Sequence, residues 1–220
     1  MKHPALRCMV AALLLSGVCA TYAADSYWYA GLGTGYSRVQ LYPADFSSRP
    51  TDPGCPCSDS KKEFDAGFKG FIGHQINRNW AAEVSYATVG KFHYKYESGG
   101  ITQDATYKVT GVGFSAVPTV PFTRNFSVYG RLGAFFSQAR LTFYNNNFQV
   151  GASSPGLQSS EVSFLSGFGA QYFLDGESGV RIEFENFGRV GSECSSNDPP
   201  GTCTGRANAK MISASAIFKF

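Results

Sequence analysis

The chain has 220 residues, and its 19 Lys and Arg against 16 Asp and Glu give a formal net charge of +3. Charged residues make up only 16% of the chain and aromatic residues 15%, a balance that excludes an intrinsically disordered protein. Its 25 glycines and its aromatic residues are weak helix formers, which excludes a helical protein and favours short aromatic-rich strands.

The first residues have the three-part layout of a secretory signal peptide. Lys2 and Arg7 precede an apolar run of 11 residues at 8–18, and small residues follow as far as Ala24. We predict that residues 1–23 are the signal peptide, with cleavage after Ala24 as the alternative. Their removal takes away two bases and no acid, so the net charge falls to +1. Because no basic stripe is present, no nucleic-acid partner is predicted.

Eight strands are predicted in residues 24–220, separated by turns rich in Asn, Asp and Gly. They cover residues 27–39, 63–76, 80–96, 105–122, 126–144, 160–174, 179–190 and 207–220. Three connections are short, at 77–79, 123–125 and 175–178, and four are long, at 40–61, 97–104, 145–159 and 191–206. All short connections fall at one end, as in single-chain outer-membrane barrels. The predicted fold class is an all-β, eight-stranded antiparallel up-and-down transmembrane β-barrel.

The alternation within the strands decides which face meets which solvent. In the strand at 179–190, Val180, Ile182 and Phe184 alternate with charged residues. If the apolar face points inward, the protein is a secreted carrier with its charges in water. If it points outward into lipid, six charged side chains meet inside the barrel, where they must pair and hydrogen-bond. We predict the second arrangement, with an interior ionic network of Lys69, Glu83, Arg131, Arg181, Glu183 and Glu185.

Aromatic residues gather at both ends of the predicted strands. The short-turn end has Trp28, Trp80, Phe122, Phe126, Phe218 and Phe220, and the long-loop end has Tyr36, Phe92, Tyr94, Tyr96, Phe143 and Tyr144. Two such bands, separated by small and aliphatic residues, are typical of the two interfaces of a membrane.

Four segments of the chain carry a resemblance to a known family. They are the opening WYAGLGTGYS, the central GVGFSAVPTVPF, the pair GFGAQYFLDGESGVRIEFENF, and the closing strand, in which Ile212, Ala214, Ala216, Phe218 and Phe220 share one parity. In these segments the chain resembles the OmpA-like eight-stranded outer-membrane β-barrel family, with a barrel domain only and no peptidoglycan-binding domain.

The resemblance implies a location and several partners. The expected location is the outer membrane of a Gram-negative cell, reached by secretion to the periplasm, with membrane lipid around the barrel. In this family the barrel-assembly machinery recognises the last strand, so Phe218 and Phe220 are expected to form the assembly signal. A surface or host ligand is the candidate partner of the outer loops.

Four cysteines remain after the signal peptide is removed: Cys55, Cys57, Cys194 and Cys203. An exported chain meets an oxidising compartment, so disulfides are the expected state. A bond between Cys194 and Cys203 would close eight residues of the last loop. Cross-pairing with Cys55 and Cys57 is the alternative, because the first and last long loops are neighbours when a barrel closes. Four thiolates would also suit zinc, but no metal and no cofactor is predicted.

Three functions remain open for this barrel. We predict a structural and interaction protein without catalysis. Eight-stranded barrels of this kind include lipid A-modifying enzymes, and His93 would be the base of such a site, but no serine stands at a recognisable spacing from it. His74 lies at the short-turn rim. The third function is a narrow ion pore lined by Arg131 and Glu183.

Overall fold

The computed structural model describes residues 26–41, 58–62, 64–98, 101–145, 157–192, 204 and 206–220. Its strands are β1 (Tyr27–Leu41), β2 (Ser58–Lys62), β3 (Phe64–Asn77), β4 (Trp80–Ser98), β5 (Ile101–Pro121), β6 (Phe126–Asn145), β7 (Leu157–Phe173), β8 (Ser178–Val190) and β9 (Ala207–Lys219). None of these described residues belongs to a helix long and apolar enough to cross a membrane.

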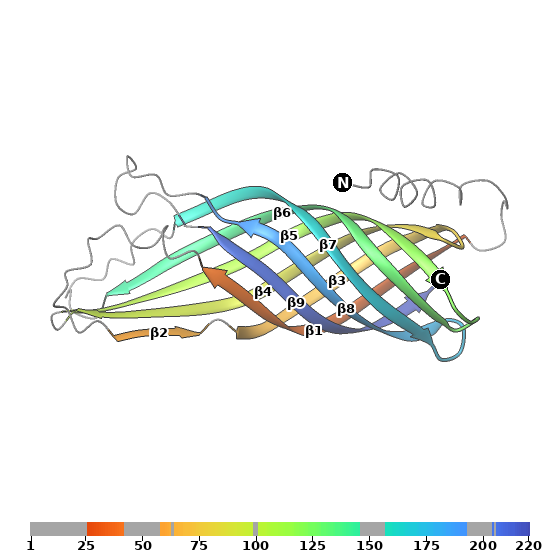
Figure 1. Ribbon diagram of the computed structural model, residues 1–220, viewed down its shortest axis with the longest axis horizontal. Helices are drawn as coiled ribbons and strands as arrows, with labels where there is room; N and C mark the ends of the chain where they lie inside the picture. The colour runs from red at the N-terminus through yellow and green to blue at the C-terminus, as the bar shows by residue number, and fades with distance from the viewer. Residues whose placement is uncertain are drawn as a thin grey trace, which may run out of the picture.

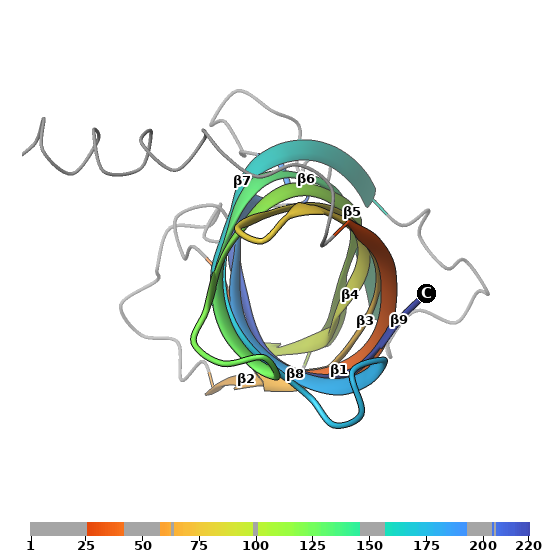
Figure 2. The same cartoon turned by 90° about the vertical axis from the view of Figure 1, so that its right-hand side faces the viewer.

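Eight of the strands form a closed antiparallel barrel (Figures 1 and 2). The order around the ring is β4-β3-β1-β9-β8-β7-β6-β5, and a further pairing of β5 with β4 closes it. Each of these eight strands pairs with the next of the eight along the chain, and β9 pairs with β1. The predicted eight-stranded up-and-down barrel is therefore confirmed. Closure leaves no long open edge in the ring, which is how a barrel satisfies its backbone groups in lipid.

Two connections at the long-loop end differ from the prediction. The predicted loop 40–61 contains β2, which pairs with residues 93–97 of β4. The predicted loop 97–104 is almost entirely strand, because β4 and β5 continue until only residues 99 and 100 separate them. The rim is consequently uneven. The 19 to 21 residues of β4, β5 and β6 extend further than the 13 of β8 and β9 (Figure 1).

A β-bulge in β4 changes which face its later residues occupy. Between Thr88 and Lys91 the register with β5 shifts, and Gly90 lies there with a φ of 99°. This left-handed conformation favours glycine because it has no Cβ. Beyond the bulge Phe92 is buried in the interior. The predicted place of Phe92 in the outward aromatic band was therefore wrong, since uninterrupted alternation had been assumed.

The exterior of the barrel is apolar and the interior holds the charges. On β8, Ile182 is 62% exposed while Arg181 and Glu183 are each 2% exposed. Aromatic side chains are exposed at both ends, among them Trp28, Phe122, Phe218 and Phe220 at the short-turn end and Tyr36 at the other. The side chains of Tyr94, Tyr96, Phe143 and Tyr144 lie outside the described part. An apolar outer face with buried charges is the arrangement suited to lipid.

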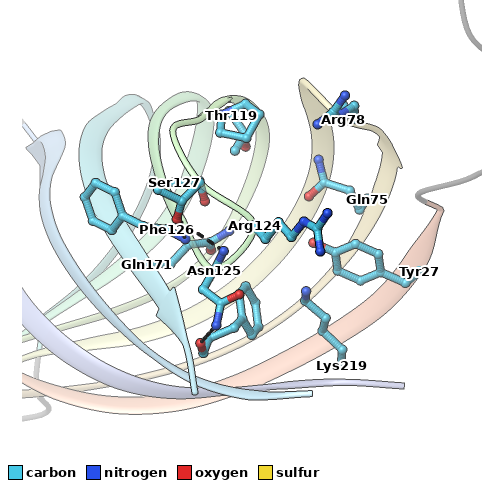
Figure 3. A pocket seen from close by; sticks show the side chains of 13 residues that line it. Tyr27, Gln75, Arg78, Thr119, Arg124, Asn125, Phe126, Ser127, Gln171 and Lys219 are labelled. Atoms are coloured by element: carbon cyan, nitrogen blue, oxygen red, sulfur yellow. Dashed lines mark hydrogen bonds between the residues drawn. The ribbon is translucent and has the colours of Figure 1, made fainter. Parts of the chain in front are cut away.

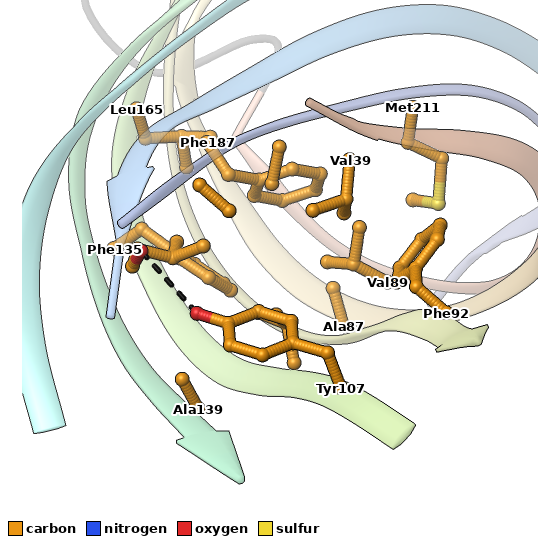
Figure 4. Close-up of a cluster of buried hydrophobic side chains, with 14 of the residues drawn as sticks. Val39, Ala87, Val89, Phe92, Tyr107, Phe135, Ala139, Leu165, Phe187 and Met211 are labelled. Carbon is orange, nitrogen blue, oxygen red and sulfur yellow. Dashed lines mark hydrogen bonds between the residues drawn. The ribbon is translucent and has the colours of Figure 1, made fainter. Parts of the chain in front are cut away.

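Two apolar clusters fill the interior on either side of the charges. The long-loop cluster (Figure 4) comprises Val39, Ala87, Val89, Phe92, Tyr107, Val109, Phe135, Ala139, Leu141, Leu165, Phe187, Val190, Ala207, Ala209 and Met211. The short-turn cluster comprises Tyr29, Phe71, Ala81, Val117, Tyr129, Phe173 and Ile217. Eight strands enclose a space that side chains can fill. Here they fill it in three layers, apolar, ionic and apolar.

The short turn between β7 and β8 is held by Asp175. Its carboxylate oxygen Oδ1 accepts hydrogen bonds from the backbone N–H of Ser178 at 2.5 Å and of Glu177 at 3.0 Å. These backbone donors, Ser178 first, lower the pKa of the Asp175 carboxyl below its ordinary value of 3.8. The turn is therefore tightest when Asp175 is ionised.

We expect Asp175→Asn to remove a pH-dependent part of the stability. Because the pKa is lower in the folded state, the carboxylate stabilises the fold above pH 3.8 and loses this effect as the pH falls through the folded pKa. Urea midpoints should therefore differ between wild type and variant near neutral pH and converge in strong acid. Glu177→Gln, in the same turn, is the control. A constant difference at all pH values would contradict the assignment.

Candidate functional site

The six predicted ionic residues lie together at mid-height inside the barrel. Lys69 comes from β3, Glu83 from β4, Arg131 from β6, and the remaining three from β8. All six side chains are at most 2% exposed. Three bases face three acids, so the site as a whole is neutral. They converge because each occupies the inward parity of its strand, and because the tilt of the strands brings these positions to one level.

The ion pairs link all six residues into one network. Lys69 pairs with Glu183, and its Nζ lies 2.8 Å from Glu185 Oε1. Arg131 pairs with Glu83, and its guanidinium nitrogens lie 3.2 Å from Glu183 Oε2 and 3.4 Å from Glu185 Oε1. Arg181 Nη1 lies 2.7 Å from Glu83 Oε2. Arg131 is thus the only base in contact with all three acids among the described ion pairs, and it forms the centre of the network.

Three neutral residues complete the network, and the sequence analysis did not single them out. Tyr29 donates its hydroxyl hydrogen to Glu83 Oε2 at 3.1 Å, and Tyr129 donates to Glu183 Oε2 at 2.8 Å. Arg181 donates to Gln171 Oε1 at 2.9 Å. Their inward parity was a usable signal for Tyr129, which alternates with apolar residues of β6. The two tyrosine bonds give buried carboxylate oxygens a further donor, and the bond to Gln171 gives the Arg181 guanidinium a further acceptor.

Aromatic rings surround the guanidinium of Arg181. Its Cζ lies 4.5 Å from the ring centroid of Phe71, 4.8 Å from that of Tyr129 and 5.2 Å from that of Tyr29. Cation–π contacts are stronger where water is excluded. The same three rings belong to the short-turn cluster, so they join the ionic layer to the apolar layer beneath it.

Two glycines make room for the tyrosines. A Cβ on Gly73 would lie 2.3 Å from Tyr29 Cζ, and a Cβ on Gly169 would lie 2.4 Å from the Tyr129 hydroxyl. Both distances are shorter than any side chain tolerates. The rings therefore lie flat over strand backbone, and this places their hydroxyl groups at the glutamates.

The remaining predicted site residues lie elsewhere. Phe218 and Phe220 point outward at the short-turn end, and Phe220 is 71% exposed. Two backbone hydrogen bonds join Phe220 to Trp28. The Phe220 N–H donates to the Trp28 carbonyl at 2.9 Å, and the Trp28 N–H donates to the Phe220 carbonyl at 3.2 Å. Residues 1–25 and all four mature cysteines, Cys55, Cys57, Cys194 and Cys203, fall outside the described residues.

The described part of the structure shows no catalytic site at a histidine. The side chain of His93 lies outside the described part of the chain. His74 Nε2 lies 3.3 Å from Ser26 Oγ, and its ring packs 4.6 Å from that of Trp28. No described group hydrogen-bonds to His74 Nδ1, so this pair lacks the orienting partner that an activated serine requires. Across the described residues, no group of three or more His, Cys, Asp or Glu could hold a metal ion.

Known proteins resemble the chain over most of its length. The OmpA-like transmembrane domain family matches residues 23–220. Outer membrane protein A of Shigella dysenteriae is 27% identical over 191 residues, which are 87% of this chain and 50% of that protein. The corresponding protein of Klebsiella aerogenes is 23% identical over the whole chain and 56% of its own length. The chain thus spans about half the length of the curated relatives it matches.

A solved structure supports the same fold. Neisserial surface protein A has a TM-score of 0.51 with 16% sequence identity, and the match covers 90% of this chain and 100% of that one. The family match and the outer membrane relatives place the protein in the outer membrane of a Gram-negative cell. A closed barrel with an apolar exterior, together with a family match over residues 23–220, shows that the chain belongs to the OmpA-like transmembrane domain family.

Proposed function

We propose that this protein is a structural and interaction barrel without catalysis, whose outer loops contact a surface or host ligand. One observation carries the proposal: three layers of buried side chains fill the middle of the barrel interior. The neutral ionic network lies between the long-loop cluster and the short-turn cluster. Among the described residues, no open passage runs through these three layers. A protein with a closed interior and no described catalytic group acts through its surfaces.

The ionic layer supports a rigid barrel better than an ion path. A conducting pore needs charges that meet passing ions, whereas Arg131 and Glu183 are buried and in contact with each other. Above them the rings of Phe135 and Phe187 pack against each other at a tilt of 50°, with their centroids 4.7 Å apart. Opening a path would require both rings to move and the ion pairs to break.

Residues at the closing seam support a role in assembly. β9 pairs with β1 along residues 207–219, and this pairing joins the last strand to the first. Phe218 and Phe220 face outward at its end, where the barrel-assembly machinery and then lipid would meet them. We propose that they form the assembly signal of the last strand. Signal peptide cleavage after Ala23 and disulfides among the outer-loop cysteines remain part of the same proposal.

Planar-bilayer recording tests the closed interior. We expect the purified wild-type barrel to give no stable current steps in 1 M KCl, because the two apolar layers exclude water. The variant Phe135→Ala/Phe187→Ala should give transient openings, since it removes two packed rings of the long-loop cluster. Phe114→Ala/Phe136→Ala removes an edge-to-face pair on the lipid face, with ring centroids 5.7 Å apart, and is the control. Regular steps in the wild-type protein would overturn the proposal in favour of a pore.

A further inference from the structure

Three cations form a row across the outer face of the barrel at its long-loop end. Lys91 of β4 lies directly opposite Lys108 of β5, and Lys108 lies directly opposite Arg140 of β6. All three residues of this cation row are exposed. Like charges at directly opposed positions of a sheet repel each other and destabilise the pairing. The row is therefore unfavourable unless a group outside the chain balances its charge.

The bulge at Gly90 is what brings Lys91 into the cation row. Before the bulge, Val84 and Tyr86 face outward. Continued alternation would turn Lys91 inward and Phe92 outward. The register shift reverses this order, so that Phe92 is buried and Lys91 is exposed. The bulge thus places a third cation beside the other two.

No described acid balances the charge of the cation row. The described ion pairs do not include any of its three side chains. Asp65 is adjacent, but its Oδ2 accepts the backbone N–H of Lys91 at 2.6 Å, and Asp65 shares the inward parity of its partner Ser37. Glu161 likewise pairs with Ser137, which is buried. Both carboxylates therefore belong to the inward parity, whereas the cation row faces outward.

Cations at the short-turn end are placed differently. Lys219 lies beside a cavity at that end, with its Nζ 3.6 Å from the ring centroid of Phe173 and 4.6 Å from that of Tyr27 (Figure 3). Arg78 and Arg124 line the same cavity. These cations surround the mouth of the barrel, whereas the cation row lies on its outer wall.

The outer wall changes from cationic to polar to apolar below the cation row. In the next row toward the short turns, Thr110 lies opposite Gln138, and Gln138 lies opposite Ser160. Two rows of aromatic and aliphatic residues follow: Tyr86, Val112, Phe136 and Val162, and then Val84, Phe114, Ala134 and Phe164. This sequence of rows matches the parts of an anionic lipid, from headgroup to acyl chains.

The length of the apolar stretch gives the depth of the cation row. The outward residues of β5 are apolar from Val112 to Val120, and a transmembrane strand crosses the hydrocarbon core with about 9–11 residues. Lys108 lies just beyond this stretch, on the side of the long loops. Because long loops lie outside the cell in such barrels, the row is at the level of the lipid headgroups of the outer leaflet.

We propose that this wall, the outer lipid site, binds a phosphorylated lipid of the outer leaflet. Phosphate groups pair with the cation row, where the Arg140 guanidinium can bind two phosphate oxygens at once. Thr110 and Gln138 donate to the oxygens that join headgroup and acyl chains, and the chains lie against Phe114 and Phe136. A soluble polyanion would leave these apolar rows unused, which favours a lipid. The site is independent of any ligand at the outer loops.

Binding is tested on the folded barrel in phosphatidylcholine nanodiscs that contain increasing fractions of lipid A, a phosphorylated and acylated disaccharide. NMR follows the side-chain amides of Gln138 and of Gln158, which lies directly opposite Arg140. We expect shifts that saturate with lipid A and that are absent with its dephosphorylated form. Inorganic phosphate and heparin are titrated separately as soluble anions. Equal saturable shifts with either would overturn the proposal, because the site would then not need a lipid.

The variant Lys108→Gln/Arg140→Gln should weaken lipid A binding by about tenfold or more, because cations near a membrane surface attract anionic lipids. Arg189→Gln/Lys210→Gln is the matched control. It removes the same charge at the same end, from exposed positions of β8 and β9 on the other side of the ring. Gel mobility before and after boiling verifies that both variants are folded. Shifts that do not saturate, or an equal loss of affinity in both variants, would overturn the proposal.

Discussion

Replacing Arg131 by methionine is expected to lower the free energy of unfolding by about 3–5 kcal/mol, the cost of leaving buried charges without their partner. Arg131 contacts Glu83, Glu183 and Glu185, so its loss leaves three buried carboxylates with only two bases. Methionine retains much of the volume, which keeps a cavity from dominating the result. Urea unfolding of the barrel in lipid vesicles, followed by tryptophan fluorescence, measures the change.

Two further variants make this result specific to the network. Arg140→Met removes the same side chain from an exposed position of the same strand, and it should change the stability by no more than about 0.5 kcal/mol. Adding Glu183→Gln to Arg131→Met should recover part of the loss, because one uncompensated charge is removed. A double-mutant cycle gives this coupling directly. The network would lose its stabilising role if Arg131→Met cost no more than Arg140→Met.

Placing an arginine at Ile182 should destabilise the inserted barrel by about 2–4 kcal/mol, as expected for a cation at mid-depth on the lipid face. Ile182 lies near the middle of β8 and is 62% exposed, so the new charge would lie in hydrocarbon. The same unfolding measurement in vesicles applies. The effect arises from the surrounding solvent, because no interior contact is lost.

Leu174→Arg is the depth control for this experiment. Leu174 is as exposed as Ile182 but lies in the turn after β7, at the interface. There the same substitution should cost about 1 kcal/mol or less, because the arginine reaches the headgroup region. Equal effects at the two positions would mean that no hydrocarbon layer surrounds the middle of the barrel.

Alternation was sufficient to predict the faces of the regular strands. On β8 the period of two placed Arg181, Glu183 and Glu185 on one face, and the structure has all three inside. The same argument failed for Phe92, because the bulge at Gly90 adds a residue and reverses the parity beyond it. A glycine inside a strand pattern is consistent with a bulge but does not require one, so this break was not predictable from the pattern alone.

The extent of strand pairing could not be predicted from the sequence pattern either. Residues 58–62 follow a long segment rich in Pro and Ser, yet they pair with the extended end of β4 as β2. Short polar segments form strands when an adjacent backbone offers hydrogen bonds, and that backbone comes from a distant part of the chain.

By itself the sequence determined which residues share a face: apolar residues at every second position and charges between them permit a barrel in lipid with its charges inside. It also determined the number of strands in the ring and the side on which short turns lie. Only the tertiary structure decided which charges pair, since that depends on strand tilt and register. Arg131 of β6 meets Glu83 of β4 across the interior, 48 residues away in the chain. Such contacts depend on the closed three-dimensional arrangement, which no local pattern of residues encodes.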